Sequence, residues 1–387
     1  NLVFLTLAGG MGWLARYMMQ LDKRAVETPV TVAPPPVQES IDASWNDVAP
    51  LDVLGLEVGY RLIPLVDKSQ DGELLRRIRG IRKKFAQEVG FLVSPVHIRD
   101  NLELKPNAYR ILLKGVEVGQ GEAYAGQFMA INPGRVAGTL NGAATKDPAF
   151  GLPAVWIDAT QREQAQAYGY TVVDASTVVA THLNHLILTH AAELLGRQEV
   201  QQLLDHLAKE IPKLVEDLVP KILPLGTLQK VLQAMLDEGV HIRDMRTIIE
   251  TVADHATRTQ NADELSTQVR IALGRAIAQQ LFPGNSEMQV MSLDPTLERL
   301  LSQAVAGGSE NTSFEPGLAD TLVRETAAAA GRQEGLGLPA VLLVPASLRL
   351  LLSRFLRRTV PQLKVLSHNE VPESRIIKVT SIIGGRT

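Results

Sequence analysis

The stretch 145–187 restricts the possible folds of this chain more than any other part, because turn, strand and helix signals follow one another closely there. Asp147-Pro148 marks a turn, since proline disfavours the helical conformation for the residue before it. Residues 154–157 and 171–173 are short apolar runs that predict buried strands. The chain is therefore expected to bring two strands and a turn together at this point.

A helix is predicted directly after the second strand, with Asp174 or Ser176 as its N-terminal cap and a stop at Gly196. A turn, strands and a helix start that meet in this way enclose an apolar hollow with a carboxylate and hydroxyls on its rim. Such a hollow suits the docking of a peptide as well as catalysis. Ser176 and His185 lie within one helix, and no Gly-x-Ser-x-Gly elbow occurs, so docking is favoured over catalysis.

Phosphate and metal chemistry find little support in the sequence. Three glycines recur every four residues, at positions 134, 138 and 142. This spacing matches neither a dinucleotide fingerprint nor a P-loop, so a glycine-bearing loop is expected. Three histidines lie on the helix after Asp174, at positions 182, 185 and 190, without a His-Glu-x-x-His pattern or any cysteine. We expect no metal, no cofactor and no enzymatic activity; a nucleotide-dependent enzyme is the alternative of a different class.

Composition limits the kinds of molecule that are expected to bind this chain. The formal net charge of −3 gives no general attraction to nucleic acid, and none is expected as a partner. The helix predicted around residues 74–85 has an apolar stripe and a basic face, which indicates a solvated face, a subunit contact or a contact with anionic lipid. The absence of cysteine excludes disulfides and fits a reducing compartment.

The first residues carry a membrane signal. Residues 1–15 are uncharged and mostly apolar, and Arg16, Lys23 and Arg24 follow. A spanning helix needs about 20 apolar residues, so residues 1–21 are predicted to be the end of a transmembrane helix. The basic residues after it place the rest of the chain in the cytoplasm. A buried or disordered apolar tail is the alternative.

Residues 22–52 are predicted to be a flexible linker, because five prolines fall within them and large apolar residues are few. Trp45 stands in this linker between Asp42 and Asp47. Tryptophan is a favoured interface anchor, which indicates a docking peptide for another subunit. The alternative is that Trp45 folds back on its own domain.

Strand and helix signals alternate over most of the remaining chain and predict an α/β multidomain (α+β) protein. It has four compact subdomains, one mainly helical, preceded by the extended linker. The expected divisions are an α/β subdomain at 53–125 and 175–196, a β-rich one at 126–174, a helical one at 197–274 and an α/β one with a partly parallel sheet at 275–387.

Several stretches, in this order along the chain, carry a family resemblance: GELLRRIRGIRKKFAQEVGF, HIRDN, AINPG, DPAFGLPAVWI, VVDASTVVATHLNHL, EDLVP, RDMRTIIET, LGRAI, FPGN and SRFLRR. They resemble the cytoplasmic domain of the flagellar export-gate family of type III secretion. The resemblance extends from about Leu54 to the end of the chain. A virulence-type secretion relative is the alternative within the same superfamily.

The resemblance implies a cytoplasmic docking platform that binds flagellar export chaperones with late cargo and orders their export. It places the most important contacts at three residues, Asp147, Phe150 and Thr181. It places the apolar lining at five others, Ile131, Pro133, Leu152, Val173 and Val178. Phe150 would supply apolar area, and Asp147 on the rim would pair with a basic residue or accept a backbone amide. The alternative is that Phe150 is ordinary core and Asp147 only begins a turn.

The same resemblance implies a ring of nine copies beneath the gate of a bacterial inner-membrane protein, with other export apparatus components as further partners. The linker residues Trp45, Asp42 and Asp47 would occupy the hollow of a neighbouring subunit and compete with chaperones. Gly55 and Gly59 would act as a hinge of the first domain, or else mark strand bulges. A domain that only builds the ring and docks nothing is a further alternative.

Overall fold

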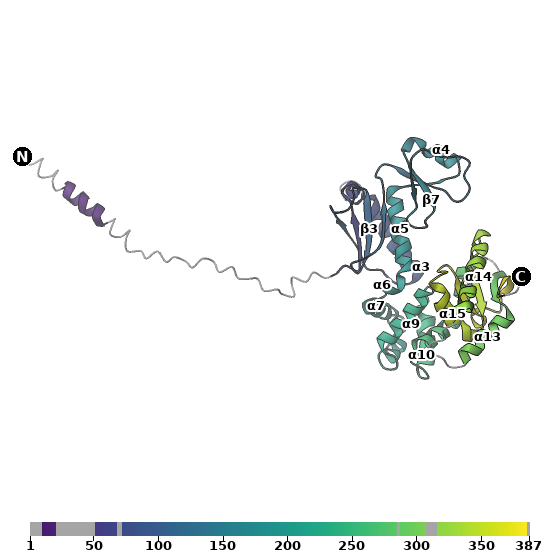
Figure 1. Ribbon diagram of the computed structural model, residues 1–387. Coiled ribbons are helices and arrows are strands. Elements are labelled where there is room, and N and C mark those ends of the chain that lie inside the picture. The colour runs from purple at the N-terminus through teal and green to yellow at the C-terminus, as the bar shows by residue number, and fades with distance from the viewer. Residues whose placement is uncertain (1–9, 21–50, 68–71, 285–286, 307–315, 385–387) are drawn as a thin grey trace, which may run out of the picture. The chain divides into compact units, whose positions relative to one another are not determined.

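The computed structural model describes residues 10–20, 51–67, 72–284, 287–306 and 316–384. The chain divides into two compact units, Asn1–Leu51 and Asp52–Thr387. In the first unit, residues 10–20 form a helix (Figure 1). Among the described residues, no helix combines the length and apolar character that crossing a membrane requires.

The predictions for the first unit concern residues that lie mostly outside this description. The end of a transmembrane helix at 1–21 and the flexible linker at 22–52 stay predictions. Asp42, Trp45 and Asp47 lie outside the described residues. The second unit can be compared with its sequence in detail.

The second unit begins with a four-stranded sheet of order β2-β1-β3-β4, in which β1 is parallel to β2 and antiparallel to β3. Its strands are β1 (Leu54–Val58), β2 (Val96–Asp100), β3 (Ala108–Leu113) and β4 (Val116–Glu122). Between β1 and β2 lie η2 (Tyr60–Leu62), α2 (Ile63–Val66) and α3 (Glu73–Val89). Helix α3 buries Leu74, Ile78, Phe85 and Val89, so the predicted apolar stripe is confirmed.

The second sheet has the order β6-β7-β5-β8, and its neighbours are all antiparallel. Its elements are β5 (Phe128–Ile131), β6 (Ala143–Lys146), β7 (Pro153–Ile157), η4 (Ala159–Gln161), α4 (Arg162–Ala167) and β8 (Thr171–Asp174). Met129 and Trp156 pair across the sheet and join the main core. Ala130 and Ile157 point to the opposite face and pack with Ala165 of α4, as the two-residue period of strands requires.

Helices follow without a strand over the described residues 175–281. They are α5 (Ala175–Thr189), α6 (Ala191–Leu194), α7 (Arg197–Leu207), α8 (Pro212–Leu218), α9 (Leu225–Asp237), α10 (Met245–Ala256), α11 (Ala262–Ala272) and α12 (Gly274–Leu281). The single helix predicted from Asp174 to Gly196 is wrong in one respect. It breaks at His190, whose φ of −102° and ψ of 22° are not helical, and restarts as α6.

The third sheet has the order β11-β10-β9-β12, and every pairing in it is parallel. It contains β9 (Glu287–Leu293), β10 (Val341–Val344), β11 (Lys364–Ser367) and β12 (Ile376–Ile383). The accompanying helices are α13 (Pro295–Ala306), α14 (Pro316–Gly335), α15 (Ala346–Arg357) and η5 (His368–Glu370). The sequence predicts a partly parallel sheet, whereas all three strand pairings of this sheet are parallel in the structure.

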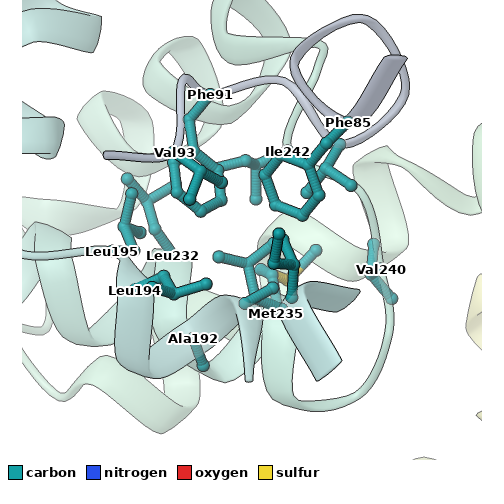
Figure 2. Close-up of a cluster of buried hydrophobic side chains, with 14 of the residues drawn as sticks. Phe85, Phe91, Val93, Ala192, Leu194, Leu195, Leu232, Met235, Val240 and Ile242 are labelled. Atoms are coloured by element: carbon teal, nitrogen blue, oxygen red, sulfur yellow. The ribbon is translucent and has the colours of Figure 1, made fainter. Parts of the chain in front are cut away.

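One apolar core runs from the first sheet through the helices. Figure 2 shows the part of this core around Phe85, Phe91 and Met235. Phe85 and Phe91 meet edge to face at 5.1 Å between ring centroids, and Leu232 and Met235 of α9 lie fully buried in the same cluster. A separate core lies with α13, α14 and α15. The α/β multidomain (α+β) class with a mainly helical part is confirmed, while the predicted boundaries of the four subdomains stay a prediction.

Candidate protein-docking site

The candidate site begins at a single helical turn between β6 and β7, with the sequence Asp147-Pro148-Ala149-Phe150-Gly151. The Asp147 carboxylate accepts a hydrogen bond from the Phe150 amide at 2.8 Å, and the Gly151 amide donates to the Asp147 carbonyl at 2.8 Å. Aspartate is a favoured N-cap, and proline suits the next position because its φ is already helical. Gly151 has φ of +69°, the left-handed conformation that ends such a turn.

The turn directs the Phe150 ring toward the solvent. Phe150 is 64% exposed, and Leu152 beside it is 39% exposed. The ring stands edge to face against His185 of α5, with 5.6 Å between the ring centroids. The alternative that Phe150 is ordinary core is therefore wrong. An exposed aromatic ring held on a closed turn is the kind of feature that marks an interaction surface.

The Asp147 side chain does not lie on the exposed rim where the sequence predicts it. The side chain is only 3% exposed, because the cap bond to Phe150 holds it beneath the turn. The expectation of a carboxylate on the rim that pairs with a basic residue is corrected on this point. The carboxylate accepts a backbone amide, but that amide is the one of Phe150 in the same turn, and acceptance of a partner's amide stays a prediction. Asp147 therefore positions Phe150.

Helix α5 contacts this turn through His185, and Asp174 fixes where the helix starts. The Asp174 carboxylate accepts from the Thr177 amide at 2.8 Å and lies 2.9 Å from the Arg77 guanidinium of α3. Ser176 is buried inside the helix, so of the two predicted caps Asp174 is correct. Because Asp174 is also the last residue of β8, α5 leaves the second sheet at a fixed point.

The other predicted site residues differ in how far they are exposed. Val178 is buried, whereas Ile131, Val173 and Thr181 are half-buried. Ile131 and Val173 pack on the main core, on the face of the second sheet that Met129 and Trp156 share. Pro133, by contrast, is exposed in the loop after β5.

His185 is absent from the predicted docking residues, although its contact with Phe150 makes it part of the site. It follows Thr181 by four residues on α5, so both side chains lie on one face of the helix. That spacing is the sequence signal that would have identified it.

A buried polar pair supports the site from below. The Tyr109 hydroxyl of β3 lies 3.0 Å from Nδ1 of His182 on α5. Burial raises the pKa of Tyr109, and the Asp147 carboxylate adds to this effect. Burial lowers the pKa of His182, nearby His185 lowers it further, and Asp147 opposes both. The pair is thus kept neutral, and it joins the first sheet to α5.

Gly55 lies in β1 of the first sheet, and Gly59 directly follows that strand. Gly55 pairs with His97 and Leu112 in an unbroken register, so the bulge alternative is wrong there. Gly59 has an extended backbone, and a Cβ atom at this residue would lie 2.3 Å from the Lys105 carbonyl oxygen. Glycine is needed at position 59 for this close approach. The hinge role of both residues stays a prediction, and the pairing of Gly55 on both sides does not favour it.

The three glycines at four-residue spacing have packing roles. Gly134 has φ of +120° and closes a turn in which its amide donates to the Asn132 side chain. A Cβ at Gly138 would meet the Tyr168 ring, and one at Gly142 would meet the Trp156 carbonyl at 2.1 Å. Among the described residues, no group of three or more His, Cys, Asp or Glu side chains could hold a metal ion.

Curated relatives resemble the chain over its whole length. It is 60% identical to "Flagellar biosynthesis protein FlhA" of Escherichia coli over 386 residues, which cover 100% of this chain and 55% of that protein. It is 58% identical to the protein of the same name from Salmonella typhimurium, with the same coverage. The chain thus spans about half the length of the curated relatives it matches.

Solved structures share the fold at low sequence identity. The CdsV and CdsO protein complex of Chlamydia pneumoniae matches with a TM-score of 0.77 and 23% identity, over 87% of this chain and 99% of that one. Nonameric EPEC SctV-C matches with a TM-score of 0.68 and 21% identity, over 87% and 100% of the two chains. The family model described as FHIPEP matches residues 1–375, and the chain belongs to the FHIPEP family.

Proposed function

We propose that this chain is the cytoplasmic docking platform of a flagellar type III protein export gate. It binds export chaperones with their late cargo and orders their export. The observation that carries the proposal is the exposure of Phe150. Its side chain is 64% exposed on a turn that a hydrogen bond from its own amide to Asp147 closes. The identity of 60% with a flagellar relative, against 20% with the EscV cytosolic domain, favours the flagellar over the virulence-type alternative.

The geometry suits protein docking for a physical reason. An aromatic side chain on a preorganised turn offers apolar area without a large entropy cost of ordering on binding. Leu152, two residues along the chain, is 39% exposed, and the predicted site residues Ile131, Val173 and Thr181 are half-buried. Such a central aromatic anchor with weaker surroundings is the usual form of a binding hot spot.

The relatives support a proposal for the assembly. EPEC SctV-C, which has the same fold, is nonameric, and we propose a nine-membered ring for this chain. The chain would be the cytoplasmic part of a bacterial inner-membrane protein, whose linker carries Trp45 to the hollow of a neighbour. Tethering supplies an effective concentration of about millimolar, so modest intrinsic affinity suffices for competition with chaperones. CdsV forms a complex with CdsO, which supports other apparatus components as partners.

The deciding experiment measures the affinity of a cargo-loaded flagellar export chaperone for the wild type and for Phe150→Ala, together with thermal melting. Phe150→Ala should weaken binding by about 2 kcal/mol or more. Its melting temperature should barely change, because the ring is mostly exposed. Leu102→Ala is the matched control, since Leu102 is a 79% exposed apolar residue in another loop. Equal affinities of wild type and Phe150→Ala would refute the site.

Two variants of Asp147 separate its possible roles. Asn is also a good N-cap, so Asp147→Asn should keep the turn and the affinity, whereas Asp147→Ala should loosen the turn and weaken binding. If both variants lose affinity equally, the charge itself contacts the partner, and the positioning role is wrong.

A further inference from the structure

A second hollow adjoins the candidate site through His185. It is a groove of about 660 Å³ between the end of α5, the loop after α9 and the segment that joins α15 to β11. Its wall includes His185, Leu188, Leu236, Val240, Arg357 and Lys364. The His185 ring contacts Phe150 and also lines the groove. The groove and the surface around Phe150 therefore share His185.

One wall of the groove is apolar. Leu188 lies on α5 three residues after His185, on the same side of the helix, and is 40% exposed. Leu236 and Val240 are each 6% exposed and form the floor, where the main core reaches the surface (Figure 2 shows Val240). A partner that covers Leu188 would extend this core without rearranging it.

The other end of the groove is cationic. Within the described part of the chain, Nζ of Lys364 makes one hydrogen bond, to the Glu238 carbonyl oxygen at 3.3 Å. Burial lowers the pKa of Lys364, and the Glu238 charge opposes this. Arg357 lies beside it, and its Nη1 donates to the Asp237 carbonyl oxygen at 3.0 Å. The groove thus ends in two cations and the single carboxylate of Asp237.

We propose that this groove receives a segment of the docked chaperone–cargo complex in which apolar side chains precede an aspartate or glutamate. The apolar side chains would cover Leu188, and the carboxylate would pair with Lys364. This inference rests on the proposed function, because the partner is the same one that contacts Phe150. The shared residue His185 and the positive charge of Lys364 in the groove wall favour this occupant.

The chemistry favours such an occupant for two reasons. A half-buried ammonium group with a single carbonyl partner has donors left over, and a carboxylate satisfies them with charge-assisted hydrogen bonds. The ion pair would form where water is already partly excluded, so it would be screened less by salt than an exposed pair. A segment without a carboxylate would cover the Lys364 ammonium group without adding a partner to the Glu238 carbonyl oxygen, which gives the groove selectivity.

The test uses the full chain and a cargo-loaded flagellar export chaperone. Lys364→Met keeps the length and apolar stem of the side chain but removes the charge, and we expect it to weaken binding about tenfold or more. Leu188→Ser should also weaken binding. The control is Lys209→Met, which removes an exposed lysine from the loop after α7 and should bind as the wild type does. Melting curves identify any variant that fails to fold.

The outcomes separate the two proposals. If Phe150→Ala weakens binding while Lys364→Met and Leu188→Ser bind like the wild type, the groove proposal is overturned and the docking site stands. If neither Phe150→Ala nor the groove variants change the affinity, both fail. Sedimentation of the same variants tests a second copy of this chain as occupant. A changed ring state with unchanged chaperone affinity would assign the groove to that copy and overturn the inference.

Discussion

The helical part of the chain contacts the α/β part before it and the one after it in different ways. Toward the first sheet the contact is apolar, where Phe85 and Phe91 pack with Leu232, Met235 and Ile242 (Figure 2). Toward the third sheet apolar packing continues, but four charged side chains join it, three of them buried and one, Glu238, 13% exposed. They are Glu238 after α9, Arg270 of α11, Arg349 of α15 and Glu370 of η5.

The charged cluster is closely paired. Arg270 lies 2.7 Å from Glu238 and 2.6 Å from Glu370, and Arg349 pairs with the same Glu238 oxygen. The side chains of Arg270, Arg349 and Glu370 are at most 3% exposed. Each glutamate therefore bridges the two arginines, with the longer Arg349–Glu370 distance at 3.7 Å.

The two contacts differ more in the geometry that they enforce than in the stability that they contribute. Apolar burial stabilises a contact in proportion to area and has no preferred direction. Buried ion pairs gain little net stability because desolvation opposes the attraction, yet breaking one leaves an unpaired charge in the interior. We infer that the first contact holds its two parts together, and that the second also fixes the angle between α11 and α15.

The largest effect should come from removing one carboxylate of the cluster. Glu370→Ala leaves Arg270 buried without one of its partners, and we expect a loss of about 3–5 kcal/mol in the free energy of unfolding. Urea unfolding followed by circular dichroism measures it. A loss below about 1 kcal/mol would mean that water reaches the cluster and that the comparison is wrong.

Removing apolar volume from the first contact should cost somewhat less on average. Leu232 is fully buried, and Leu232→Ala should reduce the free energy of unfolding by about 2–5 kcal/mol through lost burial and a residual cavity. Leu336→Ala, at a 75% exposed leucine, is the control and should change little. If both variants unfold at the same urea concentration, the first contact does not depend on its apolar packing.

The two contacts also differ in how far the sequence predicts them. The stripe of Leu228, Val231, Leu232 and Met235 has helical spacing, so a local pattern predicts its burial. The charged cluster has no local pattern, because Glu238 and Arg349 are separated by 111 residues and Arg270 and Glu370 by 100. Charged residues on helices usually face solvent, and only the packed fold shows which ones do not.

The candidate site divides in the same way. The turn from Asp147 to Gly151 and the cap at Asp174 follow from local backbone chemistry, so the sequence predicts both. The burial of Asp147 and the contact of Phe150 with His185 depend on how α5 lies against the β6–β7 turn. Sequence spacing alone does not specify that arrangement. For this reason the sequence predicts the Asp147 carboxylate on the rim, although it is buried.

A smaller effect is expected in the pH dependence of folding stability, through His182 in the core beside the first contact. The folded-state pKa of His182 lies below its ordinary value, chiefly through burial, so the unfolded state binds more protons. Its contribution to stability is complete above about pH 6.5 and is lost as the pH falls toward the folded pKa. The groups that face His182 are Tyr109, His185 and Asp147, and His182→Gln leaves all three in the sequence.

Unfolding of His182→Gln at pH 7.5 and 5.5 should therefore show a weaker pH dependence than unfolding of the wild type. His206→Gln is the control, because His206 is exposed and its replacement should leave the slope unchanged. Identical slopes for the wild type and His182→Gln would assign the pH response to other groups.

The smallest effect should come from an exposed ion pair that joins the same two helices as the charged cluster. Arg354 of α15 lies 2.6 Å from Asp263 of α11, with the two side chains 58% and 38% exposed. A double-mutant cycle of Arg354→Ala and Asp263→Ala should give a coupling energy of about 0–1 kcal/mol, because water screens both charges and the side chains lose entropy on pairing. The coupling should fall further at high salt, whereas the cost of Glu370→Ala should change little, since buried pairs are screened much less. A coupling comparable to the loss in Glu370→Ala would show that burial does not separate the two pairs, and the fixed angle between α11 and α15 would then have to be attributed to both.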